Sequence, residues 1–278
     1  MYVGIDIGGT KTLVAKLSDD GQIIDSRRFP SDHDYGQFLR DLGANLKELE
    51  LEEGEFRVCA GIAGLLDRRA GIVHALGNLP WQDKPIRDDI SQLLGGAKVL
   101  IENDSRLAGL SEAQLVKDQY DNVLFLTVST GIGGAFIQNG RIAKALQDTE
   151  MGKMPLWHDG QYVHWEEFAG GRGVVNVLHK QAVEITDPAE WRTIGTNLAH
   201  GLGAVCSVLQ PEVIILGGSV GKYADKYSGT ILEFLAQHLH PVVRQPEAIL
   251  AAQRPDEAVI YGCYDLARQV YGNGGTDG

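Results

Sequence analysis

The sequence predicts an α/β protein that consists of two related domains. Its 278 residues are enough for two domains of ordinary size, each with its own hydrophobic core. Two similar units, near residues 1–18 and 123–138, each contain an apolar strand, a glycine turn with a hydroxyl residue and a second extended segment. Because this unit occurs twice, we expect two copies of one domain, over 1–116 and 117–271, with a ligand in the cleft between them.

The elements of the first domain follow from the spacing of its apolar residues. Val3, Ile5 and Ile7 are β-formers in a short apolar run, so the first strand should be buried. The expected order is strands at 2–7, 12–18 and 22–29, a helix at 35–49, strands at 57–63 and 97–102, and a helix at 104–116. The first three strands should form a meander within a mixed sheet.

The second domain should repeat this order of elements. The expected elements are strands at 123–129, 133–138 and 141–145, helices at 164–183 and 188–209, a strand at 212–217, a helix at 225–238, a strand at 247–251 and a helix at 256–270. The last helix could pack back on the first domain. The glycine-rich tail at 272–278 should be disordered.

The first glycine turn has the composition of a phosphate and metal site. Asp6 lies near the carboxyl end of a buried strand, where an unpaired carboxylate is costly, so it should hold a cation or accept several hydrogen bonds. Gly8 and Gly9 let backbone N–H groups approach phosphate oxygens, and Thr10 and Lys11 add donors. The alternative is an ordinary glycine hairpin next to an acid.

The second glycine turn follows the strand at 123–129. Thr130, Gly131 and Gly133 again place a hydroxyl and backbone N–H groups after a buried strand. A polyphosphate lying between the two turns would be held by both. Neither turn matches the helix-opening glycine loop of P-loop or dinucleotide-binding proteins, because an extended segment follows each of them.

Composition narrows the classes of partner. The formal net charge is -12, from 25 basic and 37 acidic residues, so sequence-independent nucleic-acid binding is disfavoured. No secretory apolar region and no run long enough to cross a bilayer occurs, and we expect a cytoplasmic protein without membrane contact. Cys59, Cys206 and Cys263 lie far apart in apolar segments, which is typical of small buried side chains rather than of reactive thiols or ligands.

Several motifs, in order along the chain, resemble those of the ROK family of sugar kinases and sugar-sensing repressors, within the actin/Hsp70/hexokinase ATPase superfamily. Besides the two glycine turns, these motifs are Gly61-Ile-Ala-Gly64, Gly77-Asn-Leu-Pro-Trp81, Glu102-Asn-Asp-Ser105 and Pro211-Glu-Val-Ile-Ile-Leu-Gly-Gly218. The resemblance implies two ribonuclease H-like domains of the actin-like ATPase fold, with the sugar on the first domain and the adenosine on the second. It also implies a homodimer.

Asp104 has two interpretations. It follows a strand and opens a helical pattern, and Asp is a favoured residue at a helix N-cap. By the family resemblance, Asp104 is instead the general base that accepts the proton of the attacking sugar hydroxyl, and the helix N-terminus favours its ionised form.

The resemblance also assigns residues that contact the sugar. Asn103 would hold a neighbouring hydroxyl, Gly64 would let the backbone come close, and Asn78 matches a further sugar contact. Glu150 and Glu166 match the two sugar glutamates of the family, and a carboxylate can accept hydrogen bonds from two adjacent hydroxyls.

Lys153 is the main departure from the family pattern. Many ROK proteins carry a Cys-x-Cys-Gly-x-x-Gly-Cys zinc site beside a Glu-x-Gly-His segment. Here no cysteine occurs between Lys153 and Trp165, and lysine replaces the histidine. Because an ammonium group is a poor zinc ligand, we expect no zinc site. Lys153 could donate to a sugar hydroxyl, contact an anionic substituent or pair with Glu150.

The predicted function is ATP-dependent phosphorylation of a hexose hydroxyl by a glucokinase-like enzyme. Asp6 would position Mg²⁺ directly or through water, the two glycine turns would hold the phosphates, and Gly217 and Gly218 would admit the adenine nucleoside. One alternative is a glucokinase that uses polyphosphate, which shorter zinc-free relatives suggest. Another is a sugar-binding or regulatory protein with weak catalysis. A DNA-binding repressor is disfavoured by the acidic charge and by the lack of a helix-turn-helix before the first strand.

Overall fold

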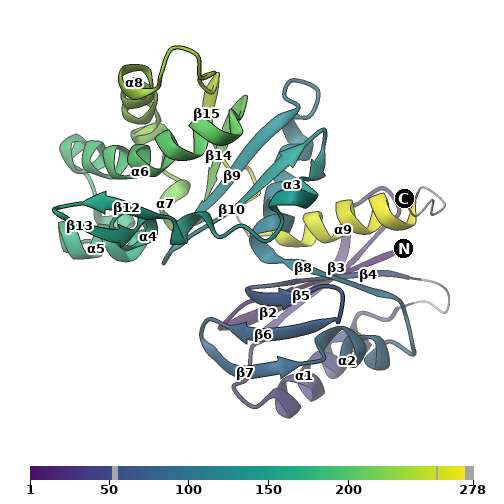
Figure 1. Cartoon of the computed structure of the whole chain (residues 1–278). Coiled ribbons are helices and arrows are strands. Elements are labelled where there is room, and N and C mark those ends of the chain that lie inside the picture. The colour runs from purple at the N-terminus through teal and green to yellow at the C-terminus, as the bar shows by residue number, and fades with distance from the viewer. Residues whose placement is uncertain (52–55, 255, 273–278) are drawn as a thin grey trace. The chain divides into compact units, whose positions relative to one another are not determined.

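The computed structural model describes residues 1–51, 56–254 and 256–272 of the chain, which divides into two compact units. The first unit is Met1–Ser111 with Asp256–Gly278, and the second is Glu112–Pro255. The division falls inside helix α3 (Asp104–Val116), not at its end. The last helix, α9 (Ala258–Tyr271), belongs to the first unit (Figure 1). The expected disordered tail lies, apart from Gly272, outside the described residues.

The first unit contains a five-stranded mixed sheet in the order β3-β2-β1-β4-β8. Its strands are β1 (Tyr2–Ile7), β2 (Lys11–Leu17), β3 (Ile23–Pro30), β4 (Arg57–Ile62) and β8 (Val99–Asn103). The antiparallel meander β1-β2-β3 and the parallel strands β4 and β8 confirm the predicted elements. Since β1, β4 and β8 run parallel, their carboxyl ends lie at one edge of the sheet.

Alternate residues of the first strand, β1, pack into two hydrophobic clusters on opposite faces of the sheet. Val3, Ile5 and Ile7 pack with helices α1 (Tyr35–Glu48) and α2 (Ile86–Leu93). On the other face, Tyr2 packs with residues of α9 and α3. Both faces of the sheet are therefore covered, which explains the near-continuous apolar run of β1.

A second, three-stranded sheet in the first unit was not predicted. It consists of β5 (Gly64–Asp67), β6 (Ile72–Leu76) and β7 (Leu79–Lys84), all antiparallel, and α2 follows it. From the sequence alone, no helix or strand is predicted between residues 63 and 97. These strands are short, and their burial alternates irregularly, so their local pattern is weak.

The second unit repeats the mixed sheet in the order β11-β10-β9-β14-β15. Its strands are β9 (Asn122–Val128), β10 (Ile132–Gln138), β11 (Arg141–Ile142), β14 (Val213–Gly217) and β15 (Ala248–Ala251). The long helix α6 (Pro188–Leu209) and helix α8 (Ser228–His238) pack on this sheet around one large apolar core. The expected strand at 141–145 is only two residues long, because the 3₁₀ turn Lys144–Leu146 follows it.

The helix expected at 164–183 is wrong as a single element. It is divided into α4 (Trp165–Ala169), α5 (Gly171–Leu178) and the 3₁₀ turn Ala182–Glu184. The break at Gly170 allows the backbone of Gly171 to bond with Ser129. An unpredicted hairpin, β12 (Pro155–His158) and β13 (Gln161–His164), precedes α4, and its two turn residues have φ values of 47° and 82°, as in a type I′ turn.

Candidate functional site

Ser31 stabilises the first glycine turn through hydrogen bonds to its backbone. The turn between β1 and β2 is closed by the Gly8 N–H, which donates to Lys11 O at 3.1 Å. Ser31 donates its hydroxyl to Gly8 O at 2.8 Å and its N–H to Thr10 O at 3.0 Å. Its hydroxyl also lies 2.9 Å from that of the buried Thr12. Ser31 was missed by the sequence analysis, because it lies beyond β3 and carries no motif.

Asp6 and Asp104 act on each other electrostatically within the first unit. Removal from water raises the pKa of Asp6, and the negative charge of Asp104 raises it further, to about 7, although Arg28 and Lys11 oppose the shift. The repulsion between two neighbouring carboxylates is relieved when one of them binds a proton or when a cation lies near both. The pair is therefore compatible with a bound divalent cation.

Asn103 and Asp104 mark the point where β8 ends and α3 begins. The Asn103 Oδ1 accepts the Ser105 N–H at 3.0 Å and the Ser105 hydroxyl at 2.6 Å. The Asp104 Oδ1 shares the same N–H at 2.7 Å. Asp104 is the first residue of the helix. Asn103 precedes it, and the Asn103 side chain accepts the N–H of Ser105, the second helical residue. Asn103 therefore occupies the N-cap position.

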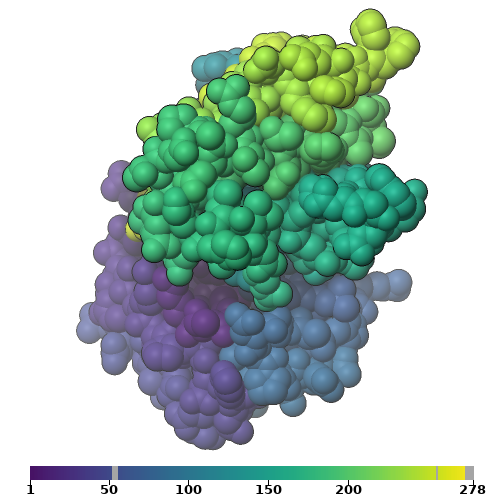
Figure 2. All heavy atoms as spheres, turned by 90° about the vertical axis from the view of Figure 1, so that its left-hand side faces the viewer, coloured from purple at the N-terminus to yellow at the C-terminus, as the bar shows by residue number. Residues whose placement is uncertain are grey.

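The two other residues predicted to contact the sugar from the first unit lie on the small sheet. Gly64 O lies 3.4 Å from the Asn103 side-chain nitrogen, which donates to it. A Cβ atom on Gly64 would lie 2.3 Å from Ala75 O, so glycine is required for strand pairing alone. Asn78, in the turn between β6 and β7, contacts Gly9, whose Cβ position would lie 3.2 Å from that of Asn78. In Figure 2 the segment that contains the three-stranded sheet is blue and lies beside the purple N-terminal residues.

In the second unit, Glu166 lies against the second glycine turn. Its Oε2 accepts the Ile132 N–H at 3.2 Å and would lie only 2.4 Å from a Cβ on Gly131. Lys153 donates to the Oε1 of Glu166. Burial alone would raise the pKa of Glu166, but the hydrogen bonds from Lys153 and Ile132, with the charge of Lys153, outweigh it and leave the pKa below its usual value.

The other residues predicted in this unit have different positions relative to the turn. Thr130 and Gly131 form the turn itself, whereas Gly133 lies inside strand β10 and pairs with Thr127. Glu150 is exposed, and its backbone oxygen accepts the Lys153 N–H at 3.0 Å. Lys153 thus forms an ion pair with Glu166, whereas the sequence had suggested Glu150 as its partner.

The turn at Gly217 and Gly218 also meets the second glycine turn. Gly218 has a φ of +83°, and a Cβ on it would lie 2.5 Å from the Ser129 hydroxyl oxygen. The Ser219 N–H donates to this hydroxyl at 3.2 Å. The backbone at Gly218 therefore requires glycine for two independent reasons, its left-handed conformation and the lack of space.

A cavity of about 460 Å³ opens beside these turns, within the second unit. It is lined by Ser129, Thr130, Gly171, Arg172, Val175, Asn176, Gln181, Ala182, Val183, Ser219, Val220 and Lys222. Its walls combine valines with two side-chain amides and two cations. Of these residues, only Thr130 is predicted from the sequence to contact the nucleotide, because the others are distributed over turns and helices that are far apart in the chain.

The predicted residues therefore form two half-sites, one in each unit. Asp6, the first turn, Gly64, Asn78, Asn103 and Asp104 lie in the first unit, and the second turn, Glu150, Lys153, Glu166, Gly217 and Gly218 lie in the second. Among the described residues, no cluster of three or more His, Cys, Asp or Glu side chains could enclose a metal ion. In residues 1–51, 56–254 and 256–272, no helix is both long and apolar enough to cross a membrane.

Comparison with known proteins gives consistent matches over nearly the whole chain. The sequence model of the ROK family matches residues 2–270. A glucokinase from Streptomyces coelicolor is 22% identical, with 97% of this chain and 98% of the relative covered. An N-acetyl-D-glucosamine kinase from Escherichia coli is 29% identical, with 88% and 92% covered. The crystal structure of a ROK family glucokinase from Streptomyces griseus, in complex with glucose and AMPPNP, has a TM-score of 0.72 at 21% identity, with 96% and 99% covered.

Proposed function

Because the chain belongs to the ROK family, we propose that this carbohydrate kinase transfers the terminal phosphate of ATP to a hexose hydroxyl, with Asp104 as the general base. The main support for Asp104 as the base is its position. Asp104 lies at the start of α3, close enough to Asp6 to raise its pKa, and next to Asn103, which bonds to Gly64. The residues that we propose as metal ligand, base and sugar contact are therefore neighbours within the first unit.

The capping geometry supports the role of Asp104 as a base. A helix N-cap needs one side chain that accepts a free N–H, and Asn103 already provides it through its bonds to Ser105. The carboxylate of Asp104 is therefore not required as a cap. At the first turn of the helix, the helix dipole favours its ionised form, which is the form that accepts a proton.

We propose residues in each unit as sugar contacts. Asn103 and Asn78 offer amide groups, and the backbone of Gly64 offers close approach. From the other unit, Glu150 and Glu166 offer carboxylate oxygens, and the lowered pKa of Glu166 keeps it ionised at neutral pH. Lys153 would donate to a sugar hydroxyl while it holds Glu166.

Asp6 would hold Mg²⁺, directly or through water. The repulsion between Asp6 and Asp104 fits a hard divalent cation, and carboxylate oxygens are its preferred protein ligands. A magnesium ion bound with few protein carboxylates takes its remaining ligands from water and phosphate oxygens. When bound, it would neutralise charge on the phosphates that the backbone N–H groups of the two turns hold.

The cavity of the second unit favours ATP over polyphosphate as the donor. Val175, Val183 and Val220 give it apolar walls, which suit the faces of an adenine ring. Arg172 and Lys222 line the same cavity and would supply positive charge for phosphates. A polyphosphate chain has no apolar part that would fill such a cavity. Gly217 and Gly218 would contribute by bringing the backbone close to the nucleoside.

The decisive experiment is a coupled ADP-release assay over a panel of hexoses, N-acetyl hexosamines and ketoses, with Mg²⁺ present and with polyphosphate as a second donor. We expect turnover with ATP and at least one neutral sugar. Asp104→Asn should lose about 2 to 3 orders of magnitude in kcat. Asp118→Asn, at an exposed carboxylate after α3, is the matched control and should retain activity. Turnover by Asp104→Asn at the native rate would leave Asp104 without a catalytic role.

The same panel tests the alternatives. Faster turnover with polyphosphate than with ATP would favour the polyphosphate-dependent glucokinase. Sugar binding detected by calorimetry, together with no ADP release from any sugar, would favour the sugar-binding or regulatory protein.

A further inference from the structure

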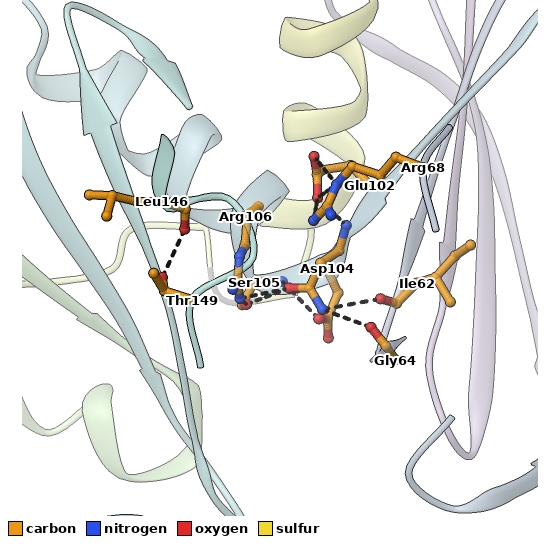
Figure 3. A network of polar contacts seen from close by, with 10 residues as sticks. Ile62, Gly64, Arg68, Glu102, Asp104, Ser105, Arg106, Leu146 and Thr149 are labelled. Carbon is orange, nitrogen blue, oxygen red and sulfur yellow. Dashed lines mark hydrogen bonds and ion pairs between the residues drawn. The ribbon is translucent and has the colours of Figure 1, made fainter. Parts of the chain in front are cut away.

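Arg68 and Glu102 form a partly buried ion pair, and Glu102 directly precedes the proposed catalytic residues. The Arg68 Nε lies 2.8 and 2.9 Å from the two carboxylate oxygens of Glu102, and its Nη2 lies 2.5 Å from Oε1 (Figure 3). Glu102 also accepts the Asn103 N–H at 2.6 Å. The side chain of Glu102 is 6% exposed and that of Arg68 is 20% exposed, so solvent screens this pair only in part.

The pair joins the two sheets of the first unit. Arg68 follows β5, in the turn that leads to β6, and so belongs to the three-stranded sheet. Glu102 lies in β8 of the five-stranded sheet, one residue before Asn103. A second link between the sheets comes from the Asn103 amide, which donates to Gly64 O of β5 at 3.4 Å. The same amide donates to Ile62 O of β4, within the five-stranded sheet, at 3.5 Å.

This link lies between two groups that must keep a fixed separation. The three-stranded sheet presents the proposed sugar contacts Gly64 and Asn78, and the end of β8 presents the proposed base. In phosphoryl transfer the protein acts almost entirely through positioning and charge, and a misplacement of about 1 Å can cost about 100-fold in rate. A movement of the small sheet would move the sugar relative to Asp104.

We propose that Arg68 is a positioning residue, which fixes the sugar-binding sheet against the Asn103-Asp104 segment through its pair with Glu102. The inference rests on the proposed function and adds a residue that no motif indicates. Arginine suits this role because its planar guanidinium meets both carboxylate oxygens at once, whereas a lysine ammonium keeps the charge without the two-point geometry.

Arg68→Lys tests the role of the geometry, and Arg69→Lys is its matched control. Arg69 is the next residue of the same turn and is exposed. For Arg68→Lys we expect kcat/KM for the sugar to fall about 10- to 100-fold, with a higher sugar KM and with KM for ATP unchanged within about twofold. Rates are divided by the folded fraction from circular dichroism. Arg69→Lys should match the native protein.

A purely structural role gives a different result. It would lower the melting temperature and the folded fraction but leave the sugar KM of the folded molecules unchanged, and that result would overturn the inference. If Arg68→Lys does not fold, the double variant Arg68→Gln/Glu102→Gln replaces the ion pair with a neutral one and is measured in the same way. A native protein that phosphorylates no sugar would overturn the proposed function itself, whereas an active native protein with an unaffected Arg68→Lys would overturn this inference alone.

Discussion

At the level of single residues, Lys153 forms an ion pair with Glu166, a carboxylate that we propose as a sugar contact. Lys153 holds the pKa of Glu166 below its usual value against the effect of burial. The side chain of Lys153 is 58% exposed and that of Glu166 is 21% exposed. Solvent therefore screens the pair, and we expect it to contribute less than about 1 kcal/mol to stability.

We predict a pH effect from Lys153→Met. Without the ammonium group, burial raises the pKa of Glu166, so its ionised form is lost at a higher pH. A depressed carboxyl pKa stabilises the fold above the unfolded pKa of about 4.3, and this contribution disappears as the pH falls. The acid limb of the kcat/KM profile for the sugar should therefore move to higher pH in the variant, as measured by initial rates between pH 4 and 8.

Lys180→Met is the control for this prediction. Lys180 pairs with Glu190 at 2.6 Å in the same unit, with exposed fractions of 43% and 20%, so the two pairs are exposed to a similar degree. It lies outside the proposed site, and its removal should leave the pH profile of the sugar reaction unchanged. A profile of Lys153→Met that coincides with that of Lys180→Met would show that Lys153 does not tune Glu166.

At the level of elements, the position of Glu166 depends on the packing of α4 against α6. Trp165, the first residue of α4, is fully buried and donates its ring N–H to Asn197 O at 3.3 Å. A Cβ on Gly201 of α6 would lie 2.1 Å from the Trp165 ring. The indole therefore fits only because residue 201 has no side chain, and Glu166 follows the indole directly in sequence.

Two glycines of α6 should respond in opposite ways to alanine. Gly201→Ala should destabilise the protein by about 1 to 3 kcal/mol, because the new methyl group displaces the indole. It should also raise the sugar KM by moving Glu166. Gly203 has no atom within 4 Å of its Cβ position, so Gly203→Ala should stabilise the helix by about 0.5 to 1 kcal/mol. Urea unfolding and sugar kinetics of both variants provide the test, and equal stabilities would contradict it.

At the level of the whole molecule, the three cysteines report on the integrity of both units. Cys59 and Cys263 are buried in the first unit and Cys206 in the second, each with at most 1% exposure. Burial raises the pKa of Cys206 to about 12 and that of Cys59 well above its usual value. The sulfur of Cys263 contacts Ile5 O at 3.8 Å. Their surroundings agree with the expectation of small buried side chains.

We predict that iodoacetamide at pH 8 leaves all three thiols of the native protein unmodified, because only exposed thiolates react at a useful rate. In denaturant all three should react. Mass spectrometry at intermediate denaturant concentrations then shows whether the first unit, with two cysteines, opens before the second. Rapid modification of any cysteine under native conditions would contradict the burial of that residue.

Much of the fold was predictable from the local pattern. Strands β1, β4, β9 and β14 are apolar runs between glycine or polar segments, and helix α6 begins with an Asp N-cap before Pro188, so these elements were confirmed within one or two residues. The small sheet and the β12-β13 hairpin were missed. Their strands are short and half-exposed, and a short pattern of this kind has no clear period.

The sequence by itself determined the two glycine turns, the acid before the first turn and the Asn-Asp pair at the start of α3, because each is encoded by neighbouring residues. Only the tertiary structure decided which distant residues support them. Ser31 under the first turn, Arg68 against Glu102, Glu166 against Gly131 and the valine-lined cavity all join segments that are far apart in the chain. The physical reason is that periodicity and capping are local, whereas such contacts depend on how whole elements pack against one another.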